Sequence, residues 1–258
     1  MPTHELSIVE LEAQASREII KAFPTLDDFR KQITQLGELI LESQPPILPD
    51  EIEESDLVCR NLFLRLMTDI FAISRLAFTG YSLQAATLAS SSFESAFMIM
   101  YVGANNDKAK QWSENQNPFK SAIGVKSSVK KAMECKGFTG QDLEDETNKF
   151  YEAYKQMCSI KHVNVYIQGS FQHRVSGDTI RLEYGADTEP RSIRLSAWTL
   201  IQFFILFLGS SHTLVLSHIE QPKQDYILAR ILILLTQSQE LVKNVNDYAI
   251  NNKINLQS

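Results

Sequence analysis

The stretch that decides the fold is residues 195–219, LSAWTLIQFFILFLGSSHTLVLSHI, which contains no Asp, Glu, Lys or Arg. A helix of this length could cross a hydrocarbon layer of ~30 Å. However, polar side chains such as Ser196, Gln202 and His212 recur along it. Because a helix that is apolar on most sides can also form the centre of a soluble bundle, we predict a central core helix and no membrane span.

The rest of the chain also has a helical pattern. With only 10 Gly and 8 Pro in 258 residues, the composition favours a few long helices over many short strands. Apolar residues recur at helical spacing in 50–78, where the stripe includes Leu57, Phe63 and Ile70,. Only residues 171–184 alternate apolar and polar side chains around a turn, as a β-hairpin does. We therefore predict an all-α bundle of about seven to eight helices with one small β-hairpin insertion.

Three prolines, Pro45, Pro46 and Pro49, interrupt the helical pattern early in the chain. Each proline fixes φ and removes a backbone donor, so a helix cannot continue through them. We predict a boundary here, with residues 1–44 forming an N-terminal helical hairpin or arm. Residues 50–250 would then form the main helical bundle, with the hairpin inserted near 171–184.

Charge and cysteine usage restrict the class of protein. The chain has 25 Lys and Arg against 31 Asp and Glu, a net charge of −6, which argues against binding duplex nucleic acid through a broad basic face. The three cysteines lie far apart without a C-x-x-C pair, as expected for reduced thiols. The first residues lack the basic start and apolar run of a secretory signal. We predict a cytoplasmic protein.

The sequence contains no motif that would assign a reaction. It has no glycine-rich phosphate loop, no G-x-S-x-G nucleophile elbow, no H-E-x-x-H and no zinc-ribbon spacing,. Cys158 and His162 have the i, i+4 spacing of two metal ligands, but nothing specifies the further ligands that a site needs. We therefore expect no cofactor and no metal.

One polar constellation remains. Glu94 stands in an otherwise uncharged helical segment, and a buried carboxylate must be paired, hydrogen-bonded or protonated. Lys155, Ser159 and His162 lie on or near one face of a predicted helix over 141–165. Lys155 or His162 could pair with Glu94 if the two helices pack together. Two interpretations stay open: a buried network that fixes helix register, or a catalytic or ligand site built on these four residues.

The order of elements resembles the HEPN superfamily of prokaryotic helical proteins. The similarity covers roughly residues 50–217 and includes the segments SFESA (92–96), FYEAY (150–154) and SIKH (159–162). It implies a helical bundle, often dimeric, in toxin–antitoxin or phage-defence systems. Active members are metal-independent ribonucleases with an Arg-x4-6-His motif. The motif His maps onto His162, but the Arg position falls at 155–157, which read Lys-Gln-Met. Lys155 keeps a positive charge without the planar fork that grips phosphate.

Three hypotheses follow. The first is a helical interaction or regulatory protein without chemistry of its own, HEPN-like, forming a homodimer or binding a partner protein in a stress or defence context. The second is a metal-independent ribonuclease acting on RNA, with His162 as general base toward a ribose 2′-hydroxyl and Lys155 stabilising the phosphorane charge. The third is a small-ligand binder with a pocket around Tyr151, Tyr154 and Glu94.

The hypotheses predict different surroundings for the same residues. A sealed network that joins Glu94 to His162 would favour the interaction protein, and an open cavity lined by the tyrosines would favour the ligand binder. A basic cluster beside His162 would favour the ribonuclease. The candidate members of that cluster are Lys126, Lys130, Lys131 and Lys161.

Overall fold

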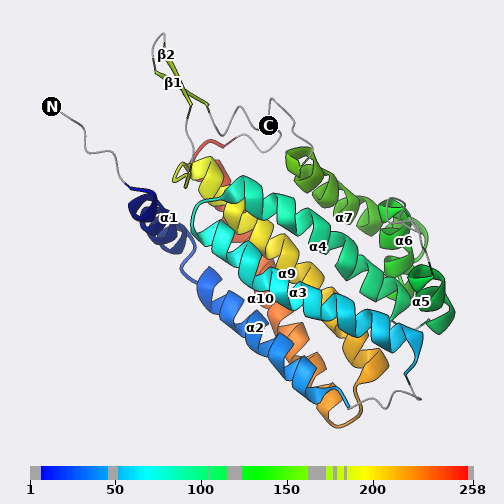
Figure 1. The fold of residues 1–258 in the computed structure, drawn as a ribbon. Coiled ribbons are helices and arrows are strands. Elements are labelled where there is room, and N and C mark those ends of the chain that lie inside the picture. The colour runs from blue at the N-terminus through cyan, green and yellow to red at the C-terminus, as the bar shows by residue number, and fades with distance from the viewer. Residues whose placement is uncertain are drawn as a thin grey trace.

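The computed structural model describes residues 7–45, 52–103, 105–114, 124–161, 173–176, 179–182 and 185–254. This part of the chain forms an all-α bundle, as the sequence predicts, and it holds nine helices (Figure 1). The helices are α1 (Ile8–Ala22), α2 (Leu26–Ser43), α3 (Glu54–Phe78), α4 (Ser82–Val102), α5 (Asn106–Ser113), α6 (Val125–Cys135), α7 (Gly140–Lys161), α9 (Pro190–His218) and α10 (Lys223–Asn251). The count exceeds the prediction because the polar stretch after α4 contains two short helices, α5 and α6.

Two short strands lie within the stretch in which the sequence predicts a hairpin. β1 (His173–Ser176) and β2 (Thr179–Leu182) pair antiparallel, with His173 opposite Leu182 and Ser176 opposite Thr179. Figure 1 shows them beyond the end of the helical bundle.

α9 is the central helix of the bundle (Figure 1). It packs against α4, α10, α3, α2 and α1, and Phe203, Phe204 and Phe207 along it are almost completely buried. By length and composition α9 could also cross a membrane, and 72% of its most apolar window is buried inside the bundle. α9 begins with Pro190 in its first turn, where the missing backbone donor costs nothing.

α1 and α2 share the core of the other helices. Ile33 and Leu36 of α2 are fully buried in the same apolar cluster as Phe207 of α9. A Cβ added at Gly37 would lie 2.1 Å from Met67 Sδ of α3, so only glycine lets the two helices approach so closely. The division of the chain near residues 44–50 stays a prediction, and the apolar core is continuous across it.

The α3–α4 turn needs a glycine for its conformation. Gly80 has a φ of +86°, a value that other residues adopt only at a cost. Its carbonyl accepts a hydrogen bond from the Asp187 amide at 3.0 Å, which ties the turn to the segment before α9. The turn folds α4 back along α3, and this places α4 between α3 and α7 (Figure 1).

Candidate functional site

The helices that carry the predicted polar constellation do pack together. α7 lies along α4, and aromatic rings join them: Phe97 lies 5.7 Å from Phe150, and Phe93 lies 5.7 Å from Tyr154, between ring centroids. Phe93 and Phe97 of α4 are fully buried. The contact therefore rests on apolar and aromatic packing, and the polar residues lie at its edge.

Glu94 lies at that edge and is exposed. The expectation of a buried Glu94 is therefore wrong. α4 uses its other sides against α3, α9 and α6, and Glu94 falls on the side that remains. Its hydrogen-bond partner is Tyr154, whose hydroxyl donates to Glu94 Oε1 at 2.8 Å. Of the two partners that the sequence suggests, Lys155 makes no such contact, and His162 is not among the residues that the structure describes.

Lys155 and Ser159 make their contacts within α7. Lys155 is exposed and pairs with Glu152, one turn away. Ser159 Oγ donates to the Gln156 carbonyl at 2.7 Å. His162 lies outside the described residues. Of the four predicted site residues, the structure thus places three, and within the described part of the chain no hydrogen bond or ion pair joins Glu94 to Lys155 or Ser159.

Tyr154 has the clearest electrostatic signature at this place. Burial, together with hydrogen bonds to Cys158 and Glu94, raises the pKa of Tyr154. The phenol therefore stays protonated and acts as a hydrogen-bond donor, which suits a structural link between α4 and α7. The sequence carried a signal for this Tyr154–Glu94 contact, because Tyr154 lies in the FYEAY segment and was grouped with Glu94 as lining of a ligand pocket.

The lysines of the predicted basic cluster have local partners. Lys130 pairs with Glu144, and Lys131 pairs with Glu134 at 2.8 Å. Lys126 Nζ lies 5.6 Å from the centroid of the Tyr151 ring, and Lys155 Nζ lies 5.5 Å from the same ring. The α6–α7 surface therefore carries positive charge that is largely balanced by neighbouring carboxylates, and two ammonium groups lie close to the Tyr151 ring.

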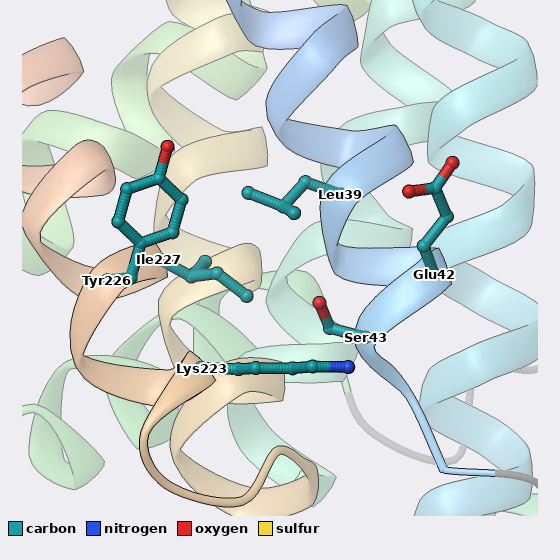
Figure 2. Close-up of a pocket in the computed structure, with 6 residues that line it drawn as sticks. All are labelled: Leu39, Glu42, Ser43, Lys223, Tyr226 and Ile227. Atoms are coloured by element: carbon teal, nitrogen blue, oxygen red, sulfur yellow. The ribbon is translucent and has the colours of Figure 1, made fainter.

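Two cavities lie elsewhere, between α2 and α10. One has a volume of about 190 Å³ and is lined by residues from the end of α2 and the start of α10 (Figure 2). The lining residues are Leu39, Glu42, Ser43, Lys223, Tyr226 and Ile227. The other, of about 140 Å³, lies near Phe29 and Leu241. Both are smaller than the ~300 Å³ at which ligand pockets usually begin, and neither is lined by Tyr151, Tyr154 or Glu94.

Two buried polar contacts connect α3 to its neighbours, and the sequence did not single them out. Ser92 Oγ of α4 donates to Asp69 Oδ2 of α3 at 2.6 Å. Asp56 of α3 accepts from Arg60 Nε at 2.7 Å and lies 3.4 Å from His218 Nδ1 at the end of α9. Burial lowers the pKa of His218. These contacts fix the positions of α4 and α9 on α3.

The outer face of α3 carries an aligned row of exposed apolar side chains. Leu57, Leu64 and Phe71 are 42%, 50% and 52% exposed. At about 100° per residue, these three side chains and the exposed Arg75 lie within about 20° of one line along the helix, and the exposed Glu53 is the residue that precedes the first turn of α3,. We call these five residues the α3 stripe. Leu57 is therefore not part of the core-facing stripe in which the sequence pattern placed it.

The described residues include no group of three or more His, Cys, Asp and Glu side chains that could hold a metal ion. Comparison of the chain with protein-family models, with curated proteins and with solved structures gave no match. The resemblance to the HEPN superfamily therefore rests on the residues alone.

Proposed function

We propose that this protein is a helical interaction protein, HEPN-like and without catalytic activity of its own, that binds another protein through the outer face of α3. Its setting would be a stress or phage-defence system. The observation that carries the proposal is the α3 stripe, in which three large apolar side chains are about half exposed along one line.

Such a stripe lowers the free energy when a partner covers it. Burying the exposed half of a Leu or Phe side chain contributes about 1 kcal/mol. Single exposed apolar residues are common on protein surfaces, but an aligned group that includes an aromatic residue is typical of interfaces. The charged residues at the two ends, Glu53 and Arg75, would belong to the polar rim.

The residues suspected of chemistry support a non-catalytic function. Lys155 pairs with Glu152, and Ser159 donates to a carbonyl of its own helix. Glu94 accepts from Tyr154, a group whose raised pKa keeps it protonated. Each of these groups already has a structural contact.

The experiment that tests this proposal compares two matched surface variants. Leu64→Glu places a charge in the α3 stripe, whereas Leu232→Glu places the same charge at a 66% exposed position on α10. Tagged wild type and both variants are expressed in the native host, and the molecular mass of each native complex is measured. We expect wild type and Leu232→Glu to run above the monomer mass and Leu64→Glu to run as a monomer. Equal complexes for both variants would contradict the proposal.

RNA binding and cleavage on the α6–α7 surface is a second candidate. The observation that favours it is Tyr151, whose ring centroid lies 5.6 Å from Lys126 Nζ and 5.5 Å from Lys155 Nζ. Aromatic rings flanked by cations stack the bases of single-stranded RNA, and His162 follows Lys161 directly in the chain. RNA cleavage in EDTA by wild type, absent in His162→Ala, would establish this function. Equal cleavage by both would indicate contamination.

A further inference from the structure

We propose that the partner of the α3 stripe is a second copy of this chain, whose α3 packs antiparallel about a two-fold axis at Leu64. This inference rests on the proposed function and names its partner. It follows from the spacing of the stripe, from its charges and from its length.

The stripe is symmetric about its middle residue. Leu64 lies seven residues from both Leu57 and Phe71, and eleven residues from both Glu53 and Arg75. In an antiparallel pair centred on Leu64, Leu57 would face the partner's Phe71 and Leu64 would face the partner's Leu64. Two-fold interfaces require this self-complementarity, because the same surface of both protomers forms the contact and every pair of facing residues therefore occurs twice.

The charges match in the same register. Glu53 would face the partner's Arg75, and Arg75 would face the partner's Glu53. Within the described part of its own chain, neither side chain has an ion-pair partner. A parallel arrangement would place Glu53 against the partner's Glu53 and Arg75 against the partner's Arg75, which like-charge repulsion disfavours. The register thus selects the antiparallel pair.

The other polar residues on this side tolerate the same register. Arg60 lies near the stripe and would face the partner's Thr68, so no like charges meet. Its guanidinium is held by Asp56, with Nε 2.7 Å from Oδ1. Arg65 is directed along its own helix, with Nε 3.8 Å from Asp69 Oδ2. The apolar centre of the interface therefore stays uncharged.

The length of the stripe sets the expected strength of the dimer. From Glu53 to Arg75 the helix spans about 33 Å, and a helix about 10 Å wide would cover roughly 300 Å² of each protomer. Standard stable interfaces cover about 800 Å² per partner. Even with contributions from α2 and α4, which flank α3 in Figure 1, we expect association with a Kd in the micromolar range.

Charge reversal tests the register directly. In Glu53→Arg, and in Arg75→Glu, both end pairs become like-charged, and we expect the dimer dissociation constant to rise about tenfold or more. The double variant Glu53→Arg, Arg75→Glu restores both pairs and should associate like wild type. Sedimentation velocity over a concentration series gives the constants, and circular dichroism confirms that each variant is folded.

Cysteine cross-linking gives a second, independent readout. In a Cys135→Ser, Cys158→Ser background, which leaves only the buried Cys59, Leu64→Cys should form a disulfide-linked dimer because this residue lies on the axis. Leu57→Cys and Phe71→Cys should each stay unlinked alone and cross-link when mixed. The same pattern in the presence of a large excess of unrelated protein would show that the contact is specific.

Several results would overturn the inference. A wild-type protein that stays monomeric at millimolar concentration has no such dimer. Failure of the double variant to restore association, or self-linking of Leu57→Cys, would exclude the antiparallel register. If the purified protein is monomeric while native complexes still depend on Leu64, the proposed function stands and the partner is a different protein.

Discussion

The two faces of α3 carry similar side chains in opposite surroundings. On the inner face Phe63 is fully buried, with its ring 5.2 Å from that of Phe207. On the outer face Phe71, two turns further along, is 52% exposed. The inner face therefore stabilises the fold, whereas the outer face leaves apolar area exposed. A long apolar helix can thus have a buried and an exposed apolar face, which its composition alone does not separate.

The largest expected effect separates the two faces by stability. Phe63→Ala should lower the free energy of unfolding by about 3–5 kcal/mol, because it removes a buried ring and leaves a cavity. Phe71→Ala should change it by no more than about 0.5 kcal/mol in the monomer. Urea unfolding at low protein concentration measures both values. Similar losses for the two variants would show that Phe71 is covered within the chain.

A smaller effect is expected at the buried contact between α3 and α4. Ser92→Ala should cost about 1–3 kcal/mol, because the Asp69 carboxylate then lacks its buried donor. Ser90→Ala is the matched control, since Ser90 is also buried in α4 but donates only to the Thr87 carbonyl of its own helix. Thermal unfolding of both variants tests this difference. If both variants lose the same stability, the Ser92–Asp69 hydrogen bond makes no special contribution.

The sequence allowed the class of the fold and the main helices to be predicted, whereas the packing of α4 against α7 entered only as a condition for the Glu94 contact. It could not place Glu94, because a single charge in an apolar helix lies equally well at an exposed edge as in a buried network. It could not place Leu57 either. Because α3 is apolar on two sides, helical periodicity does not tell which side faces the core. The buried Asp69 was not predicted either. Its hydrogen-bond donor, Ser92, belongs to another helix, and the sequence does not show which side chains of two helices meet.

The smallest effect is expected at the exposed edge of α4. Tyr154→Phe should lower the free energy of unfolding by about 0.5–1 kcal/mol at neutral pH. The effect is small because the hydrogen bond that is lost has an exposed carboxylate, that of Glu94, as its acceptor,. The pKa of Tyr154 is raised in the folded protein, so its contribution is present below the unfolded pKa of about 10 and is lost as the pH rises above it. The variant should therefore show a shallower alkaline loss of stability. An unchanged alkaline slope would contradict this assignment.

The most direct test of the central claim is the mass of the purified protein over a concentration series, measured by sedimentation for wild type, Leu64→Glu and Leu232→Glu. We expect wild type and Leu232→Glu to approach twice the chain mass of 29.3 kDa, whereas Leu64→Glu stays at the monomer mass. A Leu64→Glu variant that associates like wild type would contradict the assignment of the outer face of α3 as the interaction surface.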